Sequence, residues 1–165
     1  MKIRTIAVLL VGAVLTLAVT GCGLIAQQAF QKATGVSVDK NGNQLTVTGP
    51  NGQKATVQGD QNKLPDGLPA SVPTYPGGTV KGSTAVTTDK GSDFTFTIQT
   101  GDDVQTVGKW YKAQLAAKGW TVESATSVGA AEILSAKMGS SAIQVSATKG
   151  SSGQTDILTV ANIAK

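Results

Sequence analysis

Short segments rich in Val, Thr and Ser recur from residue 36 to the end of the chain, and the Gly-containing turns between them constrain the fold more than any other feature. In residues 93–100 (DFTFTIQT) apolar and polar side chains alternate, as they do in a strand with one buried face. Turn-forming residues 89–92 separate this segment from a similar one at 79–87. The pattern predicts a β-hairpin within an antiparallel sheet.

One segment departs from this alternation and has the spacing of a helix. Its apolar side chains fall on one side of that helix: Val104, Val107, Tyr111 and Leu115. Residues 100–103 (TGDD) open it, because a Thr or Asp side chain can cap the free backbone N–H groups and acidic residues favour the positive end of the helix dipole. Gly119 ends it, since a left-handed cap favours glycine.

Four further strands are predicted after the helix, the first beginning at Trp120 and the others at 132–138, 142–148 and 156–163. We therefore expect residues 79–165 to form an α+β domain. In it, one helix packs on an antiparallel sheet with the element order β-β-α-β-β-β-β.

A small β-meander is predicted before this domain, at residues 36–63, because Asn-Gly turns separate its three short Val- and Thr-rich runs. Alternation places Leu45 and Val47 on one face of the meander, with Ala55 and Val57 available beside them.

Residues 64–78 join the meander to the α+β domain and hold four of the five prolines of the chain. They cannot form a regular helix or a central strand. Their apolar residues Leu68, Val72 and Tyr75 favour an extended strap that lies on the domain over a free linker.

Residues 1–21 have the layout of a secretory signal peptide, with Lys2 and Arg4 ahead of the uncharged apolar run 6–19. A membrane-spanning helix needs about 20 apolar residues, so a spanning segment is the weaker alternative. The run ends in LAVTGC, which resembles the lipobox of bacterial lipoproteins. Aliphatic Val19 stands at the third position before Cys22, and small Gly21 directly precedes it.

This resemblance implies cleavage between Gly21 and Cys22 and a diacylglyceryl group on the Cys22 sulfur. The freed amine can then carry a further acyl chain such as palmitate. Two acyl chains are enough for stable anchoring. Cys22 is the only cysteine in the chain, so the mature domain contains no disulfide. An ordinary buried cysteine is the alternative at this position.

The expected location is therefore the outer side of the cell membrane or the outer membrane. Residues 22–35 are expected to form the anchor and tether, in which residues 24–33 (LIAQQAFQKA) are either a short helix or an extended linker. Without Lys2 and Arg4, 12 of the 14 basic side chains remain against 10 acidic ones. These lysines are spread singly, which argues against nucleic acid as a partner.

Most of the mature chain resembles a group of small bacterial lipoproteins that have no assigned reaction. The resemblance lies in a strap of the form P-x-Y-P-G at residues 73–77 and in a helix of the form W-Y-x-x-x-L-x-x-x-G-W at residues 110–120. It implies an α+β fold with a packed helix, and it carries over no functional residue.

The chemistry that the sequence lacks narrows the function further. The chain contains no histidine, the commonest general base and zinc ligand. Most of its ten carboxylates lie in predicted turns or in the helix cap, where Asp102 and Asp103 are expected to stabilise the helix and not to bind metal. We therefore predict no catalytic, cofactor-binding or metal-binding residues.

Trp110 lies one position off the apolar stripe of the helix, and Trp is enriched in interfaces, so Trp110 is the candidate contact for a ligand or partner. We expect a membrane-anchored, non-catalytic binding or structural module of the cell envelope, whose partner is a protein, a glycan or a membrane surface. The alternative is a carboxylate-only hydrolase. It would need a groove with two carboxylates whose oxygens are free to react.

Overall fold

The computed structural model describes residues 36–38, 44–49, 54–60, 62–150 and 152–165. The expected signal peptide 1–21, the tether 22–35 with Cys22, and the Asn-Gly turns of the meander lie outside the described residues. In the described part of the chain, no helix is long and apolar enough to cross a membrane.

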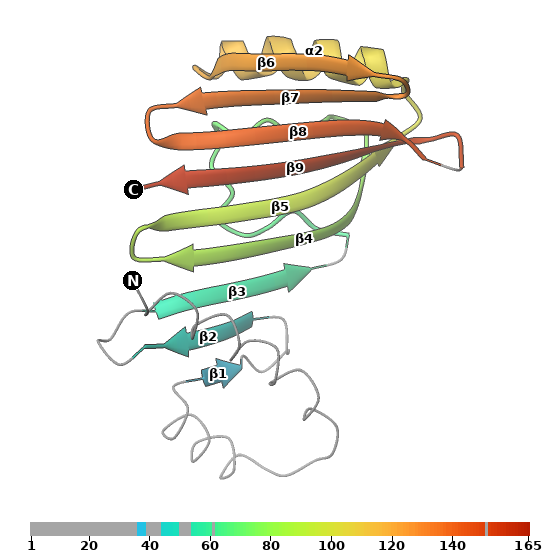
Figure 1. Ribbon diagram of the computed structural model, residues 1–165. Helices are drawn as coiled ribbons and strands as arrows, with labels where there is room; N and C mark the ends of the chain where they lie inside the picture. Colours follow the sequence, from blue (N-terminus) through green and yellow to red (C-terminus); the bar gives the residue numbers. More distant parts are fainter. Residues whose placement is uncertain (1–35, 39–43, 50–53, 61, 151) are drawn as a thin grey trace, which may run out of the picture. The chain divides into compact units, whose positions relative to one another are not determined.

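Nine strands form one antiparallel sheet, and a single described helix packs on it (Figure 1). The strands are β1 (Val36–Val38), β2 (Gln44–Thr48), β3 (Lys54–Asp60), β4 (Thr79–Thr88), β5 (Gly91–Thr100), β6 (Thr121–Val128), β7 (Ala131–Met138), β8 (Ser141–Lys149) and β9 (Thr155–Ala164). Their order in the sheet is β1-β2-β3-β4-β5-β9-β8-β7-β6. The predicted α+β class and the order of the elements are confirmed. Because β3 pairs with β4, the meander continues the same sheet.

Helix α2 (Val104–Ala117) follows β5, and both of its ends have the expected caps. The side chain of Asp103 accepts a hydrogen bond from the Thr106 N–H at 2.8 Å, so Asp103 is the N-cap residue. Gly119 has a φ of +85°, the left-handed conformation that ends helices. The Trp120 N–H then donates to the Leu115 carbonyl at 2.9 Å, which places Trp120 against the last turn.

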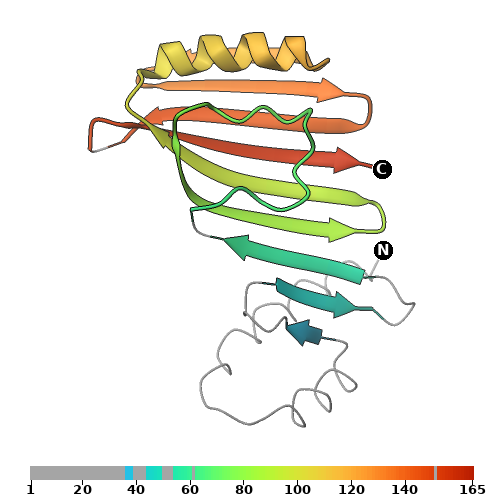
Figure 2. The same cartoon turned by 180° about the vertical axis from the view of Figure 1, so that it is seen from behind.

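The strap 64–78 and α2 lie side by side over the same face of the sheet, which Figure 2 shows from the front. We call this covered side the helix side and the other side the open face. Helix α2 contacts β6, β7 and β8, whereas the strap crosses the sheet beside the helix. Val72 and Tyr75 of the strap belong to the buried core, so this segment is an integral part of the domain.

The core fills the space between the sheet, α2 and the strap. Its largest fully buried side chains include Tyr111, Phe96, Ile98, Leu115, Leu134, Ile157, Val107 and Val145. The stripe predicted for α2 is buried at Val107, Tyr111 and Leu115, while Val104 at its N-terminal end is half-buried.

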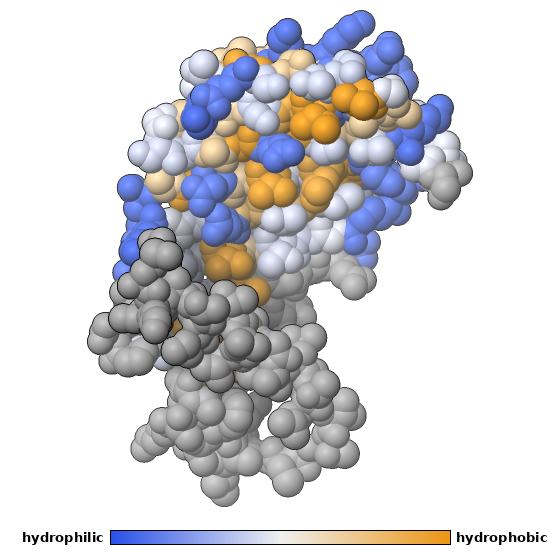
Figure 3. Space-filling model, viewed as in Figure 1, coloured by the Kyte–Doolittle hydropathy of each residue, from blue (hydrophilic) through white to orange (hydrophobic). Residues whose placement is uncertain are grey.

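The open face of β4–β9 is mainly polar, and the residues that face it come from the alternate positions of each strand. Thr95 is paired with Val160 and Thr97 with Leu158, and both aliphatic side chains are 43% exposed. Figure 3 shows apolar side chains in the middle of this face, surrounded by hydrophilic ones.

Candidate functional site

A groove runs between the strap and α2, with a cavity volume of about 630 Å³. Six of the side chains that line it are Leu64, Leu68, Val72, Trp110, Gln114 and Lys118. Leu64, Leu68 and Trp110 are only half-buried, although they pack against the core. The groove therefore exposes apolar surface that is not buried in the core. The Gln114 amide and the Lys118 ammonium lie next to this surface.

Two hydrogen bonds from the C-terminal end of α2 hold the strap in place beside the helix. The Trp120 Nε1–H donates to the Ser71 carbonyl at 2.7 Å. The Lys118 ammonium donates to the Ala70 carbonyl at 2.5 Å. Because the strap lacks regular secondary structure, its backbone carbonyls need partners of this kind.

Tyr75 ties the strap to the other end of α2. Its hydroxyl donates to the Asp102 carboxylate at 2.6 Å. Burial, followed by the hydrogen bond to Asp102, raises the pKa of Tyr75 to about 12, so the tyrosine stays protonated and remains a donor at neutral pH. The strap is thus bonded near both ends of the helix.

Three aromatic rings form a cluster, and Trp110 is the member of it that lines the groove. The ring centroids of Trp110 and Tyr75 lie 5.0 Å apart in an edge-to-face arrangement. Trp110 and Tyr111 meet at 4.9 Å, also edge to face, and Tyr75 stacks on Tyr111 at 6.1 Å. Contacts of this kind favour a fixed ring orientation, so Trp110 is held as a rigid side wall.

The two tryptophans have different environments. Trp120 is 3% exposed and fits the predicted packing role at the helix end. Trp110 is half-buried and lines the groove, while its neighbour Tyr111 is fully buried. Trp110, the sequence candidate for a ligand or partner contact, is thus placed in an open groove, and its role in binding remains a prediction.

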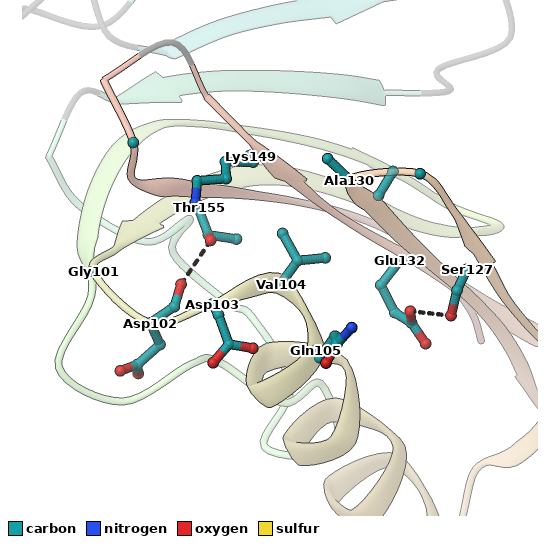
Figure 4. Close-up of a pocket in the computed structure, with 13 residues that line it drawn as sticks. Gly101, Asp102, Asp103, Val104, Gln105, Ser127, Ala130, Glu132, Lys149 and Thr155 are labelled. Atoms are coloured by element: carbon teal, nitrogen blue, oxygen red, sulfur yellow. Dashed lines mark hydrogen bonds between the residues drawn. The ribbon is translucent and has the colours of Figure 1, made fainter.

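A second pocket, of about 400 Å³, lies at the N-terminal end of α2 (Figure 4). The carboxylates of Asp102, Asp103 and Glu132 are among its lining side chains, together with Lys149. This is the place where a carboxylate-only hydrolase would have its reactive groups.

Each of these carboxylates has a hydrogen-bond partner that serves the fold. Asp103 accepts from the Thr106 backbone N–H and from its hydroxyl, both at 2.8 Å, and these bonds hold the pKa of Asp103 below its usual value. Asp102 accepts from Tyr75, and Glu132 accepts from the Ser127 hydroxyl at 2.5 Å. Figure 4 shows Asp102 and Glu132 on opposite sides of the first turn of α2. Asp103 thus caps α2, Asp102 holds the strap, and Glu132 of β7 bonds to Ser127 of β6.

Within the described residues, no group of three or more His, Cys, Asp or Glu side chains could hold a metal ion. The two residues of the predicted cleavage and lipidation site, Gly21 and Cys22, lie outside the described part. Of the residues singled out from the sequence, Trp110 lies in the groove. The residues of the expected lipid anchor are not described.

The role of Tyr75 is the feature that sequence reasoning missed. The sequence identifies Tyr75 as an apolar residue of the strap and as part of its P-x-Y-P-G pattern, but not as a hydrogen-bond donor. The signal available was the pair of acidic residues before α2, because a buried tyrosine hydroxyl requires an acceptor and Asp102 provides one. Nothing local to either residue indicates that they meet.

A family model described as START domain-like matches residues 80–156, from β4 to the second residue of β9. The matched part is a little under half of the chain and leaves out the meander and the strap. No curated protein matches the chain, and no solved structure does. Over β4 to β8 with α2, the chain is thus similar to START-like domains.

Proposed function

We propose that this protein is a lipid-anchored, extracytoplasmic binding module without catalytic activity, and that it takes its ligand in the groove between the strap and α2. The proposal rests on the position of Trp110. This large aromatic side chain is fixed by two edge-to-face contacts and lines an open groove. Rigid aromatic side chains in concave sites are typical anchors of binding energy.

The similarity to START-like domains supports a binding role, because such domains are generally binding modules. The anchor is supported by the lipobox-like residues 17–22 and by the absence of any cysteine other than Cys22. An anchored module of this kind needs no chemistry of its own, since the anchor raises its local concentration at the membrane.

The groove sets the chemical class of the ligand. Leu64, Leu68 and Trp110 present apolar surface, which suits a flat or aliphatic body. The Lys118 ammonium and the Gln114 amide, both on α2, suit an anionic or hydrogen-bonding group at one side. The expected ligand therefore combines an apolar part with a polar or anionic group.

A fluorescent probe with this composition, anilinonaphthalene sulfonate, tests the groove directly. We expect the Trp110→Ala variant to lose about tenfold in affinity for the probe, which corresponds to about 1.4 kcal/mol. Val128→Ala is the matched control, because Val128 is 63% exposed and does not line the groove. In the variant, Trp120 is the only remaining tryptophan, and its emission reports whether the fold is intact.

Equal probe affinity in the wild type, the Trp110 variant and the Val128 variant would contradict binding in the groove. A loss in the Val128 variant alone would place the probe elsewhere and contradict it as well.

A further inference from the structure

Among the described residues, two side-chain hydroxyls lie in the core without a hydrogen-bond partner. They belong to Tyr111 of α2 and Thr159 of β9, and both residues are fully buried. Thr159 pairs with Phe96 and Val145, which are also buried, so its hydroxyl lies in an apolar part of the core on the helix side. A buried hydroxyl without a partner destabilises the fold, because it has lost its hydrogen bonds to water. Packing alone therefore does not explain these two groups.

The Tyr111 hydroxyl is enclosed between the strap and β9. Burial raises the pKa of Tyr111 to about 12, whereas the nearby Thr159 hydroxyl and the nearby Tyr75 backbone act in the opposite direction. The ring of Tyr75 also stacks on the ring of Tyr111. Figure 2 shows the strap crossing in front of β9. The strap is thus the element that covers the two hydroxyls on this side.

Two glycines bracket the part of the strap that makes these contacts. Gly67 has a φ of +76° and Gly77 a φ of +71°, and a Cβ at either position would meet no other atom within 4 Å. Residues 68–76 between them are joined to α2 and its flanking residues by the three hydrogen bonds described above. A segment with few attachments can move as a unit when loop residues at its two ends change their backbone angles.

The surroundings of the two hydroxyls determine which chemical group they can bind. The buried polar side chains described in the core are those of Ser, Thr, Tyr and Trp, none of which carries a charge. An ionised group placed there would lose its hydration without meeting an opposite charge. A hydroxyl can donate to a carbonyl oxygen, and it can donate to or accept from another hydroxyl. The two hydroxyls therefore suit a neutral carbonyl or hydroxyl group on an apolar body.

We propose that residues 68–76 open about their two flanking glycines and admit a neutral carbonyl or hydroxyl group of the ligand to Tyr111 and Thr159. The proposal rests on the groove of the proposed function, which runs along the same segment and supplies apolar surface for the rest of the ligand. Trp110 lies between the two sites, because it lines the groove while its ring contacts both Tyr75 and Tyr111. We call the two hydroxyls the inner site.

The naphthyl ketone prodan tests the inner site, because it is neutral and its emission responds to the surroundings of its carbonyl group. Tyr111→Phe keeps the ring and removes the hydroxyl. We expect this variant to bind prodan about fivefold more weakly. Its affinity for anilinonaphthalene sulfonate should be unchanged, because that anion stays in the groove beside Lys118. Its free energy of unfolding should be unchanged or higher, because the hydroxyl has no partner when the strap is closed.

A cysteine in place of Thr159 reports the opening of the strap. In a chain that also carries Cys22→Ser, this thiol is the only one. Ala136→Cys in the same chain is the matched control, because Ala136 is 2% exposed on β7, which α2 contacts. We expect N-ethylmaleimide to modify residue 159 at least about tenfold faster than residue 136 without denaturant, since local opening needs less free energy than global unfolding. Bound prodan should slow the reaction at residue 159.

Equal modification rates at residues 159 and 136 would overturn the opening of the strap. A Tyr111→Phe variant that loses stability and binds prodan normally would overturn the inner site, because the hydroxyl would then serve the fold, for example through a bound water. Trp110→Ala separates the two proposals. If it weakens the binding of both probes while Tyr111→Phe weakens neither, only the inner site is contradicted. Equal affinity for both probes in all variants contradicts the groove as well.

Discussion

The two parts of the sheet bury opposite faces. On β4–β9 the buried apolar side chains point to the helix side, where Phe94 and Phe96 are at most 3% exposed. On β1–β3 the apolar side chains point to the open face, and the helix side carries Thr46 and Thr56. A continuous sheet thus changes its apolar side between β4 and β3. Strand alternation alone therefore does not identify the covered face, which depends on register and on the elements that pack nearby.

The largest expected difference between the two parts is in the cost of removing a buried side chain. Phe96→Ala should lower the free energy of unfolding by about 3–5 kcal/mol, because Phe96 is 1% exposed in the core. Val57→Ala should cost less than about 1 kcal/mol, because Val57 is half-buried on the open face. Denaturant unfolding measures both. Similar losses would mean that the meander has a core of its own.

The attachment of the strap is the next feature to test. Trp120→Phe removes the donor to the Ser71 carbonyl and should lower the free energy of unfolding by about 2 kcal/mol. Trp110→Phe is the control, since Trp110 is half-buried and should cost less. If the control variant were the less stable of the two, Trp110 would be a core residue and the groove would lose its candidate contact. Thermal unfolding of both variants decides between these outcomes.

The cap of α2 gives a smaller effect that depends on pH. The pKa of Asp103 is lower in the folded protein than in the unfolded chain, chiefly because of the hydrogen bond from the Thr106 N–H. Its carboxylate therefore stabilises the fold above the unfolded pKa, near 4, and this contribution is lost as the pH falls through the folded value. Asp103→Asn should flatten the change in melting temperature between neutral pH and pH 3. An unchanged pH profile in the variant would contradict this role.

The smallest effect is expected at the surface of the meander. Val47→Thr should change the free energy of unfolding by less than about 0.5 kcal/mol, because Val47 is exposed and β-branched Thr suits a strand equally well. Denaturant unfolding measures the change. A large loss of stability would contradict the exposed position.

Local patterns were sufficient for most of the fold. The β4–β5 hairpin, α2 and its caps follow from residues close together in the sequence, such as Asp103 and Gly119. The pairing of Val57 with Val86 is different, because the strap separates the two residues in the chain. The alternation within each strand was clear, yet the relation between the two strands required the three-dimensional structure.

The residues of the groove could also be predicted only in part from the sequence. Trp110 could be identified from helical phase alone, since it lies one position from the buried stripe. The strap residues that face it, among them Leu64 and Leu68, could not be assigned to it from sequence. Their contact depends on how the strap crosses the sheet, and the Tyr75–Asp102 and Trp120–Ser71 hydrogen bonds set that crossing.

The proposed function is tested most directly by the intact mass and membrane fractionation of the protein from its native host, beside a Cys22→Ser variant. The account predicts a mature chain that begins at Cys22, carries a diacylglyceryl group and remains in the membrane fraction. It predicts that the variant loses both the lipid and the membrane retention. An uncleaved, unmodified chain that stays in the membrane would contradict the account, because residues 1–21 would then be a spanning helix and Cys22 an ordinary cysteine.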